Sequence, residues 1–189
     1  DSLPEEVRGF DETWKIFGVG ERIYFCTFNR IYVYDGLGLK VIDTKKRMDI
    51  PFQLGERLYT QILGEGLVEV TDATLSPIPG GDFYKDKRVS NILPYDKDKW
   101  LVSTFSQGLF LYDGRSSVPF VMKGDFWRNE FLINYSLRLN KGNIALATQN
   151  AGLFVIDREG NLLTHLDKEA GLMDLTINYI FEDNQEGLW

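Results

Sequence analysis

Cysteine and histidine are almost absent from this chain of 189 residues, which contains one of each, Cys26 and His165. A single cysteine excludes an intrachain disulfide framework and a cysteine-rich metal site. A single histidine would leave a zinc site dependent on carboxylates, which is unusual. A catalytic Cys26/His165 pair is disfavoured because Cys26 falls within a hydrophobic strand, where a thiol is buried and inert. We therefore expect no catalytic residue, no metal and no cofactor.

Long hydrophobic runs and an excess of basic residues are also missing. No run approaches the roughly 18 residues of a membrane-spanning helix, so we expect no direct membrane insertion. The 21 Lys and Arg against 28 Asp and Glu give a net charge of −7. Nucleic-acid binding needs clustered cations, and we expect no nucleic-acid partner. With 43% hydrophobic and 14% aromatic residues, the chain can bury a core.

What the chain does contain is a repeat. A short hydrophobic strand ends in Thr or Phe, a turn follows, Gly-Leu opens a second strand, and Asp with a nearby Gly closes it. The equivalent positions recur at intervals of 35, 42, 44 and 45 residues, at Ile23, Leu58, Trp100, Ile144 and Trp189. A period of 40 to 45 residues with short strands is typical of propeller blades of four strands each. Helical solenoids share such periods but need helical spacing of hydrophobic residues, which these segments lack.

We accordingly predict an all-β fold, a β-propeller of four-stranded antiparallel blades, about four blades plus a partial fifth. Residues 1–189 would form a single partial propeller, with blades near 10–50, 51–88, 89–131, 132–175 and 176–189. The third repeat is the clearest, with strands A to D at 91–95, 100–105, 108–112 and 119–122. The second is degenerate, because Thr71 replaces the aspartate. Residues 80–90 are expected to be a polar connection between blades.

The phrase Ala170-Gly171-Leu172, followed by Ile180, Glu182-Asp183 and Gly187-Leu188-Trp189, resembles the repeats of the two-component-regulator propeller family. The Gly-Leu-aromatic-x-x-Asp strands and the opening Glu12 to Ile16 resemble the same sensors, some of which carry a triple-tyrosine domain. The resemblance implies a periplasmic, non-enzymatic sensor propeller of a bacterial regulator, whose kinase or DNA-binding output would lie outside this chain.

The same resemblance implies the partners. These are a small-molecule or oligosaccharide ligand, often derived from carbohydrate, and the remaining blades and adjacent periplasmic domain of a longer parent protein. Exposed strand edges on an incomplete propeller also predict pairing into a dimer. Two alternatives stay open: a protein-interaction or structural propeller without a small ligand, and a propeller lyase or glycosidase. Carboxyls with strongly raised pKa values would favour the enzyme.

The candidate ligand-binding residues follow from propeller geometry. The B–C turns and the D–A connections of a propeller share one face, and each B–C turn here carries one polar residue: Asn29, Glu65, Gln107 and Asn150. We interpret them as part of a ring around a channel mouth, although turns are also polar simply because they face water.

Trp127 and Arg128 are a further candidate pair. They lie in a D–A connection, where an aromatic ring beside an arginine can stack on a sugar or anchor a partner. The same tryptophan can equally fill the gap between blades. The segment Asp183 to Gly187 superficially resembles a calcium loop, but it lacks the twelve-residue spacing and occupies an A–B turn.

Overall fold

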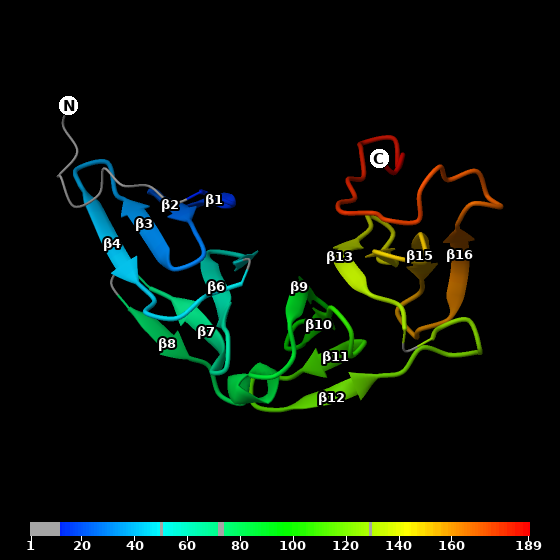
Figure 1. Ribbon diagram of the computed structural model, residues 1–189, viewed down its shortest axis with the longest axis horizontal. Helices are drawn as coiled ribbons and strands as arrows, with labels where there is room; N and C mark the ends of the chain where they lie inside the picture. The colour runs from blue at the N-terminus through cyan, green and yellow to red at the C-terminus, as the bar shows by residue number, and fades with distance from the viewer. Residues whose placement is uncertain (1–11, 50, 72–73, 129) are drawn as a thin grey trace. The chain divides into compact units, whose positions relative to one another are not determined.

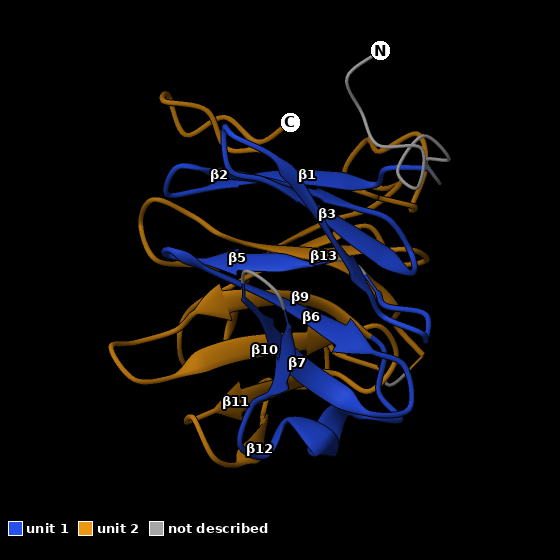
Figure 2. Cartoon of the chain, turned by 90° about the vertical axis from the view of Figure 1, so that its left-hand side faces the viewer, with its two compact units in different colours: residues 1–88 blue, residues 89–189 orange. Residues whose placement is uncertain are grey.

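The computed structural model describes residues 12–49, 51–71, 74–128 and 130–189 (Figure 1). Residues 10, 11 and 50, at the limits of the first expected blade, lie outside this set. The chain forms two compact units, Asp1–Arg88 and Val89–Trp189, which Figure 2 colours separately. Whether they belong to one propeller domain stays a prediction, and each unit is described by itself.

Unit 1 contains two four-stranded sheets and one short 3-10 helix. The first sheet has the order β1 (Lys15–Val19), β2 (Arg22–Cys26), β3 (Arg30–Tyr34), β4 (Leu39–Asp43). The second has the order β5 (Phe52–Leu54), β6 (Arg57–Ile62), β7 (Gly66–Val70), β8 (Leu75–Pro77). The 3-10 helix η2 (Gly81–Tyr84) follows.

Unit 2 repeats this arrangement. Its first sheet joins β9 (Val89–Pro94), β10 (Trp100–Thr104), β11 (Leu109–Tyr112) and β12 (Ser117–Phe120). Its second joins β13 (Ile133–Arg138), β14 (Ile144–Thr148), β15 (Leu153–Ile156) and β16 (Leu162–Leu166). Strand D of the third repeat therefore begins at Ser117, two residues earlier than predicted.

Every neighbouring pair of strands within these sheets is antiparallel and consecutive in sequence. A sequential four-stranded antiparallel meander is the unit of a propeller blade. The predicted all-β class of four-stranded blades is confirmed. Over the described ranges, no α-helix occurs, and no helix is long and apolar enough to cross a membrane.

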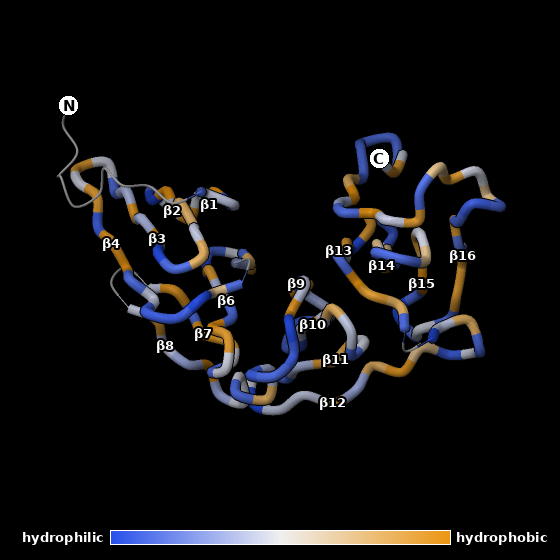
Figure 3. Tube along the Cα trace, viewed as in Figure 1, coloured by the Kyte–Doolittle hydropathy of each residue, from blue (hydrophilic) through white to orange (hydrophobic). Residues whose placement is uncertain are grey.

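The central strands B and C supply most of the buried core residues. In unit 2, all five residues of β14 and all four of β15 are buried. Aromatic and β-branched residues suit this pleated, enclosed surface. Along the trace, hydrophobic segments alternate with hydrophilic turns (Figure 3).

Polar groups pair where the inner strands of unit 2 meet. The Asn91 Nδ2 of β9 donates to the Ser136 backbone oxygen of β13 at 2.5 Å, and the hydroxyls of Ser103 and Ser136 lie 2.8 Å apart. All three side chains are buried. A buried polar group must find a partner to avoid a desolvation cost, so these bonds fix how the two blades of this unit adjoin.

The recurring threonine at the end of strand B closes the B–C turn. The Thr148 hydroxyl donates to the Gly152 oxygen at 2.8 Å and accepts from the Ala151 amide at 2.9 Å. Thr104 repeats both bonds, to the Gly108 oxygen and from the Gln107 amide. Thr27 does the same in the first blade, where it bonds Arg30. The repeat thus encodes a turn.

The recurring aspartate closes the C–D turn in a similar way. The Asp113 Oδ1 accepts from the amides of Arg115 and Ser116 at 3.0 and 2.8 Å. Asp157 accepts from Glu159 and Asn161 in the fourth blade. A short side chain that bonds the backbone two or three residues further on is an Asx turn.

The degenerate second repeat lacks both the threonine at the end of strand B and the aspartate of the C–D turn. The Thr71 hydroxyl donates to the Thr74 oxygen in place of the aspartate. Ile62 takes the place of the strand-B threonine, and the fully buried Gln61 before it donates to the backbone oxygens of Tyr84 and Lys87 in the following connection. The connection expected at 80–90 is mostly polar, but it contains η2 and the completely buried Tyr84, and its last two residues begin β9.

The fifth repeat is a hairpin without a named strand. Phe181 and Trp189 exchange two backbone hydrogen bonds, at 2.9 and 2.8 Å, and Glu182 pairs with Leu188. The partial fifth blade expected at 176–189 is therefore a narrow ladder.

Candidate functional site

The B–C turns and the D–A connections lie at the same end of the strands in each unit, which we call the loop end. In unit 1, the Met48 amide donates to the Phe28 oxygen at 2.7 Å. In unit 2, the Ile133 amide donates to the Phe105 oxygen at 2.8 Å. Each D–A connection therefore crosses the preceding B–C turn, as propeller geometry predicts. The A–B and C–D turns occupy the opposite end, the hairpin end.

A hollow of about 480 Å³ opens at the loop end of unit 1. This volume lies within the usual range of small-molecule sites. Its walls come from the residue before β1, the two B–C turns and the two D–A connections of the unit. They are Trp14, Phe28, Arg47, Asp49, Leu63 and Arg88. We call it the loop-end hollow.

One side of the loop-end hollow is aromatic. The rings of Trp14 and Phe28 lie 4.8 Å apart and are tilted by 47°. The Arg47 guanidinium carbon sits 4.3 Å from the centre of the Phe28 ring, in cation–π range. Trp14 is 49% exposed, which is unusual for so large a ring. This side can therefore offer both a ring surface and hydrogen-bond donors.

The other side holds an ion pair. The Arg88 Nε lies 3.2 Å from the Asp49 Oδ2. The Asp49 side chain is only 11% exposed, whereas that of Arg88 is 58% exposed. The buried carboxylate thus anchors an arginine that reaches solvent.

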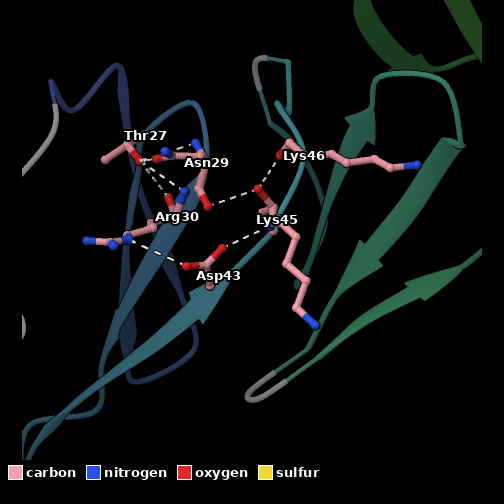
Figure 4. Close-up of polar contacts among 7 residues, drawn as sticks. Thr27, Asn29, Arg30, Asp43, Lys45 and Lys46 are labelled. Carbon is pink, nitrogen blue, oxygen red and sulfur yellow. Dashed lines mark hydrogen bonds and ion pairs between the residues drawn. The ribbon is translucent and has the colours of Figure 1, made fainter.

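The predicted residues of unit 1, Asn29 and Glu65, do not line this hollow, although they lie in the B–C turns that supply Phe28 and Leu63 to it. The Asn29 backbone oxygen accepts from the Thr44 amide and hydroxyl, both at 2.9 Å (Figure 4). The Thr44 hydroxyl also bonds the Lys46 oxygen, and the Lys46 Nζ lies 2.8 Å from the Glu65 Oε1. Asn29 and Glu65 are therefore linked through the same D–A connection, and both are exposed.

The predicted residues of unit 2 lie at its loop end. The Asn150 Oδ1 accepts from the Leu132 amide at 3.0 Å, and its Nδ2 donates to the Glu130 oxygen at 2.8 Å. Its amide thus fastens the D–A connection. Gln107 is exposed, and its backbone amide donates to the Thr104 hydroxyl, which fixes its place in the turn. A ring joining all four residues stays a prediction.

Trp127 packs inward and is half-buried. Its ring contacts those of Phe131 and Phe154, each with centroids 5.4 Å away and in edge-to-face geometry. Phe154 is itself buried and stacks on His165 at 4.1 Å. These contacts favour the gap-filling interpretation of Trp127. Arg128 is exposed and forms a loose ion pair with Glu130 at 3.7 Å.

A second hollow, of about 560 Å³, lies at the hairpin end of unit 1. Its lining mixes four acidic side chains, two arginines and several hydrophobic residues: Glu21, Asp35, Glu56, Glu69, Arg22, Arg57, Val19, Tyr24, Leu37, Leu58 and Val70. Arg57 and Glu69 are 3.7 Å apart, and Asp35 accepts bonds from its own turn. The sequence analysis did not anticipate a hollow at this end.

The titratable side chains show little catalytic character. Burial raises the pKa of Cys26 to about 12, the opposite of an activated thiol. Cys26 ends β2 rather than lying in its middle. The His165 Nε2 is 2.8 Å from the Ala151 oxygen.

Five carboxyl groups have pKa values that are lowered, and not raised as a general acid requires. Backbone amides lower the pKa values of Asp35, Asp113 and Asp174, and hydrogen bonds from Asn161 and Trp189 lower those of Asp157 and Asp183. A general acid in a glycosidase needs a raised pKa. Asp183, in the calcium-like segment, accepts from the Gln185 and Gly187 amides and from the Trp189 indole, as a turn aspartate does. Across the described parts of the chain, no group of three His, Cys, Asp or Glu side chains could hold a metal ion.

Sequence reasoning missed the residues that form the loop-end hollow. Arg47 and Arg88 are separated by more than one blade in the sequence, and Trp14 precedes the first strand. The repeat pattern placed the turns on one face, but no repeated residue type marks these positions. Phe28 itself gave no distinctive signal, because the third repeat also has a phenylalanine, Phe105, after its strand-B threonine.

No family model and no curated protein matches the chain. Solved structures do. Two crystal structures of the extracellular domain of BT4673 from B. thetaiotaomicron, described as a one-component and as a hybrid two-component system, superpose with TM-scores of 0.70 and 0.72 at 18% identity. Both matches cover 99% of this chain and 27% of that chain.

Two other solved structures show how widely the fold is used. The extracellular domain of the hybrid two-component system BT3049 from B. thetaiotaomicron gives a TM-score of 0.63 at 18% identity, over 94% of this chain and 25% of that one. PorZ of Porphyromonas gingivalis, described as a surface component of the type-IX secretion system, gives 0.54 at 9% identity, over 89% and 36%. The chain spans about a quarter of the length of the first three matches. It therefore has the fold of part of the extracellular domains of BT4673 and BT3049, in agreement with the resemblance of its repeats.

Proposed function

We propose that this chain is a non-enzymatic, ligand-binding part of the extracytoplasmic, periplasmic sensor region of a bacterial signal-transduction regulator. One observation carries the proposal: a hollow lined by aromatic rings and arginines opens at the loop end of unit 1. The fold shared with extracellular domains of hybrid two-component systems supports the cellular context. Carbohydrate-derived compounds are the first ligand class to test, since an exposed ring such as that of Trp14 can stack on a sugar.

The mechanism is a shift in population between loop arrangements. The blades are rigid because the B–C and C–D turns are closed by side-chain bonds, such as those of Thr27 and Asp35. A ligand in the loop-end hollow would contact Arg47 and Asp49 of one D–A connection and Arg88 of the next. Ligand binding would thereby favour one arrangement of these connections over another, and neighbouring domains would receive that change.

Thermal-shift measurement of the intact extracytoplasmic region tests the proposal. Ligands that bind the native state raise the melting midpoint by mass action. We expect a saturable rise from one class among glycans, glycan breakdown products and small metabolites. The Trp14→Ala variant should lose the rise, while Trp100→Phe, at an inner position of unit 2, should keep it. No rise from any class in a folded sample would contradict a small-ligand sensor.

A second candidate function is docking to a protein partner. The fifth-repeat hairpin of unit 2 exposes three aromatic side chains, with Tyr179 and Phe181 each 56% exposed and Trp189 79% exposed. Exposed aromatic residues are enriched at interfaces. Pull-down with the remaining parts of the parent protein, comparing the wild type with Phe181→Ser, separates this function from ligand binding.

A further inference from the structure

The loop-end hollow is positive although the chain is acidic. Two of its six lining residues are arginines and one is an aspartate, against a net charge of −7 for the whole chain. The nearby charges Lys46 and Glu65 pair with each other at 2.8 Å. The net charge of the residues that line the hollow is therefore positive, whereas that of the whole chain is negative.

The two members of the Arg88–Asp49 ion pair differ in exposure, so the positive member dominates the surface of the hollow. Asp49 is 11% exposed and its partner Arg88 is 58% exposed. A ligand entering from solvent would meet the guanidinium before the carboxylate. Asp49 then acts as a positioning residue, because it holds the Arg88 side chain over the hollow.

Arg47 presents a second guanidinium. Its guanidinium carbon lies over the Phe28 ring, 4.3 Å from the ring centre, and the N–H donors of a guanidinium lie along the edge of its plane. Such an edge matches the two oxygens of a carboxylate in a bidentate pair. Lysine cannot replace this geometry, because its ammonium is a point charge without a planar fork.

Three acidic side chains of unit 1 lie far from the hollow. Glu21, Asp35 and Glu56 lie in turns at the hairpin end, one strand length from the loop end. A strand of five residues spans about 16 Å, while charges are screened over about 10 Å at 0.1 M salt. These three side chains therefore contribute little to the field in the hollow.

We infer that the loop-end hollow binds a carboxylate attached to a six-membered ring, with the carboxylate on Arg47 and Arg88 and the ring on Trp14. This inference rests on the proposed ligand-binding function and adds the charge of the ligand to it. Two classes of compound carry a carboxylate on a six-membered ring in this way, sugar acids and aromatic acids. The exposed Trp14 face accepts either ring.

Isothermal titration of the full chain with two matched pairs of probes tests the inference. Glucuronate is compared with glucose, and benzoate with benzyl alcohol, because each pair differs only in whether the ring carries a carboxylate or a hydroxymethyl group. We expect one of the acids to bind and its neutral counterpart to bind at least about tenfold more weakly, as loss of a charged hydrogen bond implies. Which acid binds identifies the class. Binding should weaken as salt rises.

The Arg47→Gln variant locates the site. Its Kd for the acid should rise about tenfold or more, and Arg47→Lys should recover little of the loss. Arg115→Gln, which changes an exposed arginine in a C–D turn of unit 2, should leave the Kd unchanged. Arg88→Gln provides a second site variant, and unchanged circular dichroism and melting midpoint verify that each variant folds.

The outcomes separate this inference from the proposed function. Equal binding of an acid and its neutral counterpart, or acid binding that survives both Arg47→Gln and Arg88→Gln, overturns the inference. Absence of binding by all four probes also overturns it. The proposed function is contradicted only if the wider thermal-shift screen finds no ligand class at all. A neutral ligand whose binding is lost in Trp14→Ala would support the proposed function and contradict the acid inference.

Discussion

Replacing the Thr148 hydroxyl by a methyl group, in Thr148→Val, removes two hydrogen bonds from a fully buried position without changing the side-chain shape. The Gly152 oxygen keeps a partner, because the Thr148 amide also donates to it at 3.0 Å. The Ala151 amide, which donates to the hydroxyl at 2.9 Å, loses its partner. A buried donor left unpaired costs about 1–3 kcal/mol, and the second bond contributes about 0.5–1.5 kcal/mol. We expect a total loss of about 1.5–4.5 kcal/mol.

Urea unfolding followed by far-ultraviolet circular dichroism measures this loss, with each transition fitted separately because the chain has two units. The matched control is Thr164→Val, an exposed position on β16, where the change should stay within about 0.5 kcal/mol. If Thr148→Val is no more destabilising than Thr164→Val, then the hydroxyl does not hold the turn and the explanation of the repeated threonine is wrong.

The remaining predictions concern a close contact, a thiol and acid stability. Gly66→Ala should destabilise unit 1 by more than about 2 kcal/mol, since a Cβ there would lie 2.2 Å from the Gly81 oxygen; urea unfolding would contradict this if Gly66→Ala matched the wild type. Cys26, with its pKa raised to about 12 by burial, should resist Ellman's reagent at pH 8 and react once urea unfolds the chain; fast reaction in the native state would refute the buried thiol. Hydrogen bonds lower the pKa values of Asp113 and Asp157 in the folded state, so their stabilisation is present above the unfolded value near about 4 and is lost as pH falls through the folded value. The melting midpoint of Asp157→Asn should therefore depend less on pH below about 5 than that of the wild type, and equal slopes would count against this assignment.

The sequence predicted the blades because the features that define them are local. Trp100 begins a strand and Asp113 follows one in the structure, where the repeat placed them. Both signals act over a few residues, through strand preference and turn chemistry. The second repeat lacks the strand-B threonine and the aspartate, and there Gln61 bonds a residue of the next connection, more than twenty positions away.

The candidate site was less predictable for the same reason. Asn29 and Glu65 were correctly placed at the loop end, since a turn position follows from the strands on either side. The hollow beside them depends on Arg47 and Arg88, which meet only after two blades have packed. Trp127 shows the converse: its loop position suggested a binding residue, and its packing on Phe154 became visible only in three dimensions.

The turn aspartates change how the acidity of such a chain should be understood. Asp35, Asp113 and Asp157 each belong to one blade and each is occupied by its own backbone. A longer chain built from the same repeat would gain a negative charge with almost every blade added, whatever it binds. The isoelectric point of a protein of this kind therefore falls as the number of such turns rises. The charge of its ligand must be inferred from the few charged residues that the repeat does not supply.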